Sequence, residues 1–232
     1  MDPSVPILEL SAARPRHEAG DAPVAAVDLC LLSGEFALVD SRHSGQVAWL
    51  ADLCSGLLPL AAGRVRFLGR DWSAMPWDYA AALRGRIGRV FRSGGWIGSV
   101  DVATNILLPQ LHHTRDDPSG LRERAVALSC AFGLPGLPLV RPLELVASDL
   151  ARAACVRAFL GDPELILLES PVQGRFITLI APLLNALAAA RDRGAAAIWF
   201  TRSDVVWRDP SFPVTHRLRL GERGLLPVAR TT

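Results

Sequence analysis

Lysine is absent from this chain, and all 25 of its basic side chains are arginine. No side chain can therefore offer a primary ammonium group to a phosphate. Long apolar runs are also missing: half of the 232 residues are hydrophobic, but no uninterrupted stretch reaches the roughly 18 residues that cross a bilayer. The charged residues 191–193 separate two apolar stretches near the C-terminus. The first ten residues lack the basic and apolar regions of a secretory signal peptide.

Cysteine is scarce, with four scattered residues in apolar surroundings. This pattern argues against a disulfide framework or a cysteine metal site, so we expect reduced thiols in the core. The net charge is +2 and both signs are interspersed, so the basic footprint of a nucleic-acid-binding protein is missing. We therefore expect a cytoplasmic protein that binds no nucleic acid and reaches a membrane only through a partner.

The stretch Phe36–Leu60 organises the chain. It predicts a buried strand, a tight polar turn and then a helix that starts near Gln46. A phosphate-binding loop, G-x-x-x-x-G-K-[ST], occupies this position in P-loop nucleotidases. On that pattern Asp40 replaces the first glycine, Gly45 is the second, Gln46 replaces lysine and Val47 replaces the hydroxyl residue. The frame of a phosphate loop is present, but its chemistry is not.

These replacements disfavour a nucleotide. Asp40 places a carboxylate where backbone N–H groups and a helix N-terminus would receive phosphate. His43 is bulky where the backbone must approach its ligand, and neither Val47 nor Ala48 has a hydroxyl for Mg²⁺. Alternatively, the segment is an ordinary turn before a helix. The candidate degenerate loop comprises Asp40, Ser41, Arg42, His43, Ser44, Gly45, Gln46, Val47 and Ala48.

Strands and helices alternate along the chain, which predicts an α/β domain with a mostly parallel sheet. The N-terminal strands are expected to form an antiparallel portion. The expected strands are 7–10, 24–32, 36–39, 63–70, 86–91, 164–168, 195–201, 216–220 and 225–228. Three helices are expected at 77–83, 118–132 and 177–193. Two more are expected with side-chain caps: one capped by Asp101 that runs to 108, and one capped by Ser148 or Asp149 that runs to 160. We predict one domain over 1–232, with a helical subdomain at about 95–160.

Five further segments follow the phosphate-loop segment in a characteristic order. They are Gly88–Arg92, Asp101–Asn105, Leu145–Asp149, Leu165–Pro171 and Phe200–Arg202. In this order and spacing the whole chain resembles the nucleotide-binding domain of ABC transporters, a P-loop NTPase fold. The resemblance assigns Arg92 to the glutamine loop, Leu145, Val146, Ala147, Ser148 and Asp149 to the signature, Glu169 to the Mg²⁺-binding aspartate, Ser170 to the catalytic glutamate and Arg202 to the switch histidine.

The departures from the family affect catalysis. Glu169 keeps a carboxylate, so it is a weak candidate metal ligand. Ser170 cannot act as a base at neutral pH, a loss that typically costs about 10²–10⁴ in rate. Arg202 cannot accept a hydrogen bond. The chain's one tyrosine, Tyr79, lies outside the N-terminal segment where the family stacks adenine on an aromatic ring.

Within the family, Val90–Ile97 and Asn105–Pro109 look most like the ATPase subunits of lipid transporters that work with mammalian-cell-entry (MCE) domains. In these systems the groove at 92–108 receives a permease helix. The resemblance therefore predicts a partner site at Gly94, Gly95, Trp96 and Ile97, with Trp96 and Ile97 exposed. The permease would hold the protein at the cytoplasmic face of the inner membrane.

Three functions remain open at this point. The chain can be a non-catalytic ABC subunit, a pseudo-ATPase that docks on a permease as a homodimer or beside an intact ATPase. It can be an active ATPase that binds ATP and Mg²⁺ with substitutes such as Arg42 or Arg92 for the lysine and Glu169 for the metal ligand. It can be a regulatory module that reuses the emptied pocket beside Arg42, His43 and Trp49. No cofactor is expected unless the second alternative holds.

Overall fold

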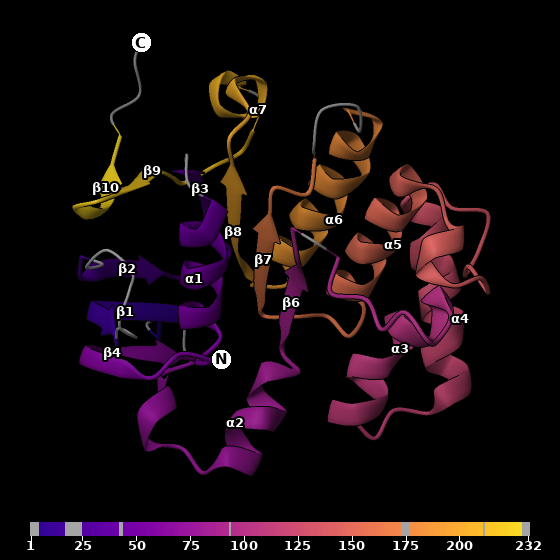
Figure 1. Cartoon of the computed structure of the whole chain (residues 1–232), viewed down its shortest axis with the longest axis horizontal. Helices are drawn as coiled ribbons and strands as arrows, with labels where there is room; N and C mark the ends of the chain where they lie inside the picture. Colours follow the sequence, from indigo (N-terminus) through magenta and orange to yellow (C-terminus); the bar gives the residue numbers. More distant parts are fainter. Residues whose placement is uncertain are drawn as a thin grey trace.

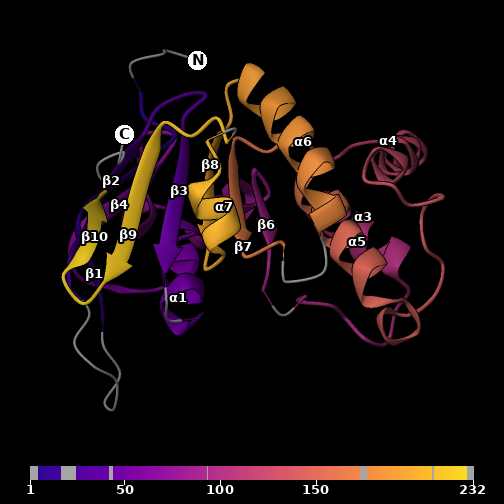
Figure 2. The same ribbon diagram turned by 90° about the horizontal axis from the view of Figure 1, so that it is seen from above.

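The computed structural model describes residues 5–16, 25–41, 44–92, 94–172, 177–210 and 212–228. Within these ranges a central sheet lies between a second, smaller sheet and a group of helices (Figure 1). The view from above shows α6 and α5 beside the same face of the central sheet (Figure 2). The α/β fold with separate sheet and helical portions is confirmed.

The central sheet has six strands in the order β10-β9-β3-β8-β7-β6. Its five neighbouring strands from β9 to β6 are parallel, and β10 pairs antiparallel with β9 in the predicted hairpin. All residues of β7 and β8 are buried, as expected for parallel strands that are covered on both faces. The strands are β3 Phe36–Ser41, β6 Ile87–Val90, β7 Leu165–Glu169, β8 Ala196–Thr201, β9 His216–Gly221 and β10 Gly224–Pro227.

The second sheet contains the predicted antiparallel N-terminal portion. Its four strands are antiparallel and follow the order β2-β1-β4-β5. Their bounds are β1 Leu8–Pro15, β2 Val27–Leu31, β4 Leu60–Phe67 and β5 Arg70–Asp71. The very short β5 was not predicted.

Helix α1 lies between the two sheets, and α3, α4 and α5 pack against one another on the other side of the central sheet. None of the helices in the described ranges is both long enough and apolar enough to cross a membrane. The α-helices are α1 Ser44–Cys54, α2 Trp77–Arg84, α3 Val102–His113, α4 Pro118–Ala131, α5 Ala147–Phe159, α6 Ile180–Asp192 and α7 Asp204–Arg208. Three 3₁₀ turns span Trp72–Ala74, Pro142–Glu144 and Ile177–Leu179.

The central sheet separates two hydrophobic cores. Side chains alternate along β3, so Phe36 and Leu38 enter the core shared with the helices, whereas Ala37 and Val39 enter the core shared with α1 and the second sheet. The phosphate-loop helix therefore packs on one face of the sheet, and the helical portion packs on the other.

Some local predictions were wrong. Helix α5 begins at Ala147 after Val146, and neither Ser148 nor Asp149 caps it with a side chain. Burial raises the pKa of the Cys54 and Cys155 thiols to about 12, but Cys30 and Cys130 are exposed rather than in the core. Helix α7 also lies in a segment for which no element was predicted.

Candidate functional site

Strand β3 runs directly into helix α1, as predicted for a phosphate-loop frame. The strand ends at the buried Ser41, and the helix begins at Ser44 rather than near Gln46. Arg42, His43 and the side chain of Ser44 lie outside the described residues. The strand and the helix thus follow each other in the predicted order, and the side chains at 42–44 stay untested.

Asp40 is neutralised within the chain. Its Oδ2 accepts a hydrogen bond from Nε of Arg219 at 3.0 Å, and the two residues are paired in the parallel register of β3 and β9. The Asp40 side chain is 16% exposed. Because Arg219 supplies an opposite charge, Asp40 repels an incoming phosphate less than an isolated carboxylate would.

The described side chains from Gly45 to Trp49 add no cation or hydroxyl group to the start of α1. Val47 is 2% exposed and packs in the core between the sheets, so its side chain does not face the loop. Gly45 is exposed, Ala48 is half-buried, and Trp49 packs partly against the same core as Val47. Gln46 Oε1 is buried with no hydrogen-bond partner among the residues the structure describes.

The carboxylate at the metal position is engaged by an arginine. Nε of Arg89 donates to Oε1 of Glu169 at 2.6 Å, and Nη1 of Arg89 donates to Oδ1 of Asp52 at 2.6 Å. The Arg89 and Glu169 side chains are 9% and 4% exposed. Within the described ranges, no group of three or more histidine, cysteine, aspartate and glutamate side chains is arranged to hold a metal ion.

A cavity of about 240 Å³ brings several predicted positions together. Its lining includes Arg92 from the glutamine loop, Ala147 from the signature and Ser170 from the catalytic-glutamate position, together with Gly94 and Trp96. Ser170 has a φ of 51°, a strained conformation for a residue with a β-carbon, and its N–H donates to the carbonyl of Phe200 at 2.9 Å.

The predicted partner loop is held by Arg157 of α5. Nη1 of Arg157 donates to the carbonyl of Gly95 at 2.8 Å, Nη2 donates to the carbonyl of Gly94, and the guanidinium lies 4.3 Å from the centre of the Trp96 ring. Burial lowers the pKa of Arg157 to about 10. Trp96 is half-buried rather than exposed as predicted, whereas Ile97 is 46% exposed.

Asn105 fixes the rest of this loop. Its buried side-chain Oδ1 accepts from the N–H of Ile97 at 2.8 Å, and Nδ2 donates to the carbonyls of Ile97 at 3.1 Å and Asp101 at 3.0 Å. The amide satisfies both the N–H and the carbonyl of Ile97, which lies outside the strands and helices, and adds a second hydrogen bond to the carbonyl of Asp101. The loop that exposes Ile97 is therefore held in place by hydrogen bonds to the buried side chain of Asn105.

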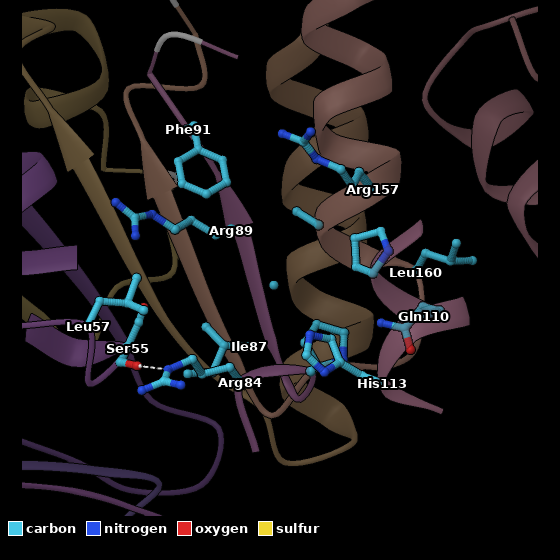
Figure 3. Close-up of a pocket in the computed structure, with 15 residues that line it drawn as sticks. Ser55, Leu57, Arg84, Ile87, Arg89, Phe91, Gln110, His113, Arg157 and Leu160 are labelled. Carbon is cyan, nitrogen blue, oxygen red and sulfur yellow. Dashed lines mark hydrogen bonds between the residues drawn. The ribbon is translucent and has the colours of Figure 1, made fainter. Parts of the chain in front are cut away.

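A second cavity, of about 200 Å³, lies between the sheet and the helical portion. Figure 3 shows Arg84, Arg89 and Phe91 on one side of it, and His113 and Arg157 on the other. Desolvation lowers the pKa of His113, and the nearby His112 and Arg84 lower it further. Both apolar side chains and arginines line this cavity.

The remaining predicted positions are more open. In the signature segment, Val146 is 61% exposed, and Asp149 forms an ion pair with Arg152 at 3.8 Å. Leu145 packs partly against the helical core, and Ser148 is half-buried in the first turn of α5. Arg202 is exposed at the end of β8, the strand beside β3.

The comparisons with known proteins agree with this architecture. No protein-family model matches the chain. It is 30% identical over 183 residues to the nickel import ATP-binding protein NikE of Pseudomonas putida, which covers 77% of this chain and 67% of that protein. The chain belongs to the ATP-binding proteins of ABC transporters.

Other members of the ABC family match over different lengths. The intermembrane phospholipid transport system ATP-binding protein MlaF of Haemophilus influenzae is 29% identical over 54% of this chain and 48% of its own length. The macrolide export ATP-binding/permease protein MacB of Hyphomonas neptunium is 27% identical over 87% of this chain, which spans only 32% of that protein. The ATP-binding cassette MJ0796, solved as a dimer with ADP and Pi, has a TM-score of 0.82 at 19% identity and covers 94% of this chain and 96% of its own.

Sequence reasoning missed the ion partners. Asp52, Arg89 and Arg219 were not singled out, although each contacts or neutralises a predicted position. One signal was available: Arg89 lies inside a strand predicted to be buried, and a buried charge requires a partner. That signal indicates that a partner exists but does not identify it.

Proposed function

We propose that this member of the ABC family is a degenerate, non-hydrolysing subunit that docks on a membrane permease and transmits or restrains its motion. The observation that carries the proposal is the absence of lysine from the whole chain. Strand β3 and helix α1 follow each other as in a phosphate-loop frame, but no side chain can bring an ammonium group to a phosphate. Ser170 and Arg202 add the loss of a base and of a hydrogen-bond acceptor.

The docking part of the proposal rests on the ordered surface around Ile97. Arg157 and Asn105 hold the loop from Gly94 to Asp101 through its backbone, and Ile97 remains 46% exposed. A cavity of about 200 Å³, lined in part by Ile87 and Phe91, is reached from the same Arg157 that holds this loop. A preformed surface of this kind suits an amphipathic permease helix, because little ordering entropy is lost on binding.

We place the transporter among lipid systems of the MCE type, at the cytoplasmic face of the inner membrane. The support is the resemblance of the Val90–Ile97 loop and the sequence similarity to MlaF, whose name describes phospholipid transport. In solution the subunit would be a homodimer or would attach to an intact ATPase.

Titration with a fluorescent ATP analogue and Mg²⁺, followed by a phosphate-release assay, tests the central claim. We expect turnover below about 0.1 per second, at the low edge of enzyme rates. Turnover above that value, lost on Glu169→Gln, would show that the alternative of an active ATPase is correct.

A further inference from the structure

Arg89 contacts Glu169, the residue that the family resemblance assigns to the Mg²⁺-binding aspartate. We infer that the Arg89 guanidinium is the resident cation of this site: it takes the place of a divalent metal on Glu169 and fastens strand β7 to helix α1. The role of Arg89 does not depend on a permease, so it can be tested on the isolated chain.

The strand geometry directs Arg89 to both carboxylates. Arg89 of β6 pairs in parallel register with Leu167 of β7, so its side chain shares a face with Leu167 and Glu169. Glu169 is the diagonal neighbour, within reach of a long side chain. Helix α1 covers this face and brings Asp52, about two turns after the helix start, to the other edge of the guanidinium.

The arrangement does not fit Mg²⁺. This ion requires near-octahedral oxygen ligands at about 2.0–2.1 Å. Oε1 of Glu169 already accepts a hydrogen bond from Nε of Arg89 at 2.6 Å, and the guanidinium also lies 4.4 Å from the centre of the Phe91 ring. A divalent ion on Glu169 would therefore meet a fixed positive charge at close range.

The chain contains a matched control pair. Arg86 and Glu164 form an ion pair at the same two strands. Arg86 immediately precedes β6 and Glu164 immediately precedes β7, so this pair lies at the starts of the strands, whereas Glu169 lies at the end of β7. These side chains are 45% and 24% exposed, against 9% and 4% for Arg89 and Glu169. Exposed pairs contribute little to stability, whereas removing one partner of a buried pair leaves an uncompensated charge.

Thermal unfolding of single and double variants separates the two pairs. Arg89→Met should lower the Tm by roughly 6–20 °C, and adding Glu169→Gln should recover more than half of that loss. Arg86→Met should change the Tm by less than about 4 °C. If Arg89→Met unfolds no more easily than Arg86→Met, the inference is overturned.

Manganese distinguishes a cation substitute from an ordinary ion pair. Mn²⁺ should raise the Tm of Arg89→Met by about 2–4 °C and should leave the wild type and the Arg89→Met/Glu169→Gln double variant unchanged. Two outcomes would show that Arg89 does not replace a metal. One is that Mn²⁺ fails to stabilise Arg89→Met. The other is that Mn²⁺ stabilises the wild type and that Glu169→Gln removes this stabilisation.

Electron paramagnetic resonance covers the case in which Arg89→Met does not fold. The signal of free Mn²⁺ is then recorded while the wild type or Glu169→Gln is added. Glutamine keeps the shape of the glutamate side chain. Equal signals with both proteins support the inference. Saturable Mn²⁺ binding that only the wild type shows would overturn it.

Discussion

A β-carbon on Gly88 would lie 1.9 Å from the carbonyl oxygen of Ala158. Strand β6 and helix α5 thus approach each other backbone to backbone, with no space for a side chain between them. Pro163 closes the site from another side, at 3.0 Å from the same point. The helical portion is therefore seated on the sheet at a position that only glycine allows.

We expect Gly88→Ala to destabilise the protein by about 3 kcal/mol, because the backbone carbonyl of Ala158 cannot move aside as a side chain could. The Tm should fall by roughly 6–12 °C in a calorimetric scan. Gly98→Ala is the control, since nothing lies within 4 Å of its added β-carbon. A similar small change in both variants would show that α5 shifts at little cost.

Asp101 should stabilise α3 in a pH-dependent way. Its carboxylate accepts a hydrogen bond from the N–H of Thr104 at 2.6 Å, and this bond lowers the pKa of Asp101. Asp101→Ala should cost about 1 kcal/mol at pH 7, measured by urea unfolding. Because the pKa is lower in the folded state, the charge-dependent part of this stabilisation is present above about pH 4 and disappears as the pH falls.

Asp101→Asn is the matched control for this cap. Asparagine keeps the oxygen that accepts from Thr104 but has no carboxylate to titrate. The stability difference between the wild type and Asp101→Asn should therefore shrink between pH 5 and pH 3, both approximate limits set by the ordinary pKa of aspartate. A difference that stays constant with pH would contradict the role of the charge.

Ile97 and Trp96 should respond differently to substitution. Trp96→Ala should cost about 2 kcal/mol, because the half-buried ring packs against the helical core and stacks on Arg157. Ile97→Ser should change stability by less than about 0.5 kcal/mol and still weaken co-purification with a co-expressed permease. Normal co-purification of Ile97→Ser would remove Ile97 from the proposed docking surface.

Gln46→Lys should not restore micromolar ATP binding. Val47 has no hydroxyl to hold Mg²⁺ and packs in the core, and the N-terminal segment offers no tyrosine on which adenine could stack. Equilibrium titration with the fluorescent ATP analogue measures the affinity of the variant. Micromolar binding by the single variant would mean that the lysine alone was missing.

A combined repair extends this test. Asp40→Gly with Val47→Ser and Gln46→Lys should gain some affinity, since the helix N-terminus and backbone N–H groups of the frame are retained. Hydrolysis should also require Ser170→Glu and Arg202→His, because groups that act as a unit contribute non-additively. Hydrolysis by the triple variant alone would contradict this order.

Much of the fold could be predicted from periodicity and from turn residues. The buried strands β7 and β8 and the hairpin β9–β10 lie within a few residues of their predicted bounds. Side-chain capping was less predictable: Asp101 caps α3 as expected, but α5 starts without a side-chain cap. Ser and Asp favour helix starts, yet packing of the apolar face decides where a buried helix begins.

The candidate site could be predicted only in part. The motif order singled out Arg92, Ala147 and Ser170, but not that the fold brings them to the lining of one cavity. The pairing of Arg89 with Glu169 spans 80 residues and depends on strand register, which the local pattern does not encode. For the same reason Trp96 was expected to be exposed, since its partner Arg157 lies on a distant helix.

Because side chains along β3 point alternately to the two faces, the central sheet separates the two hydrophobic cores. Leu38 and Val39 are neighbours in the chain, yet each contributes to a different core. Substitutions on the α1 face therefore leave the packing beneath α3 and α5 untouched, and the effects on stability from the two faces should add. The side chains on the α1 face can change in this way without altering how the helical portion packs on the sheet.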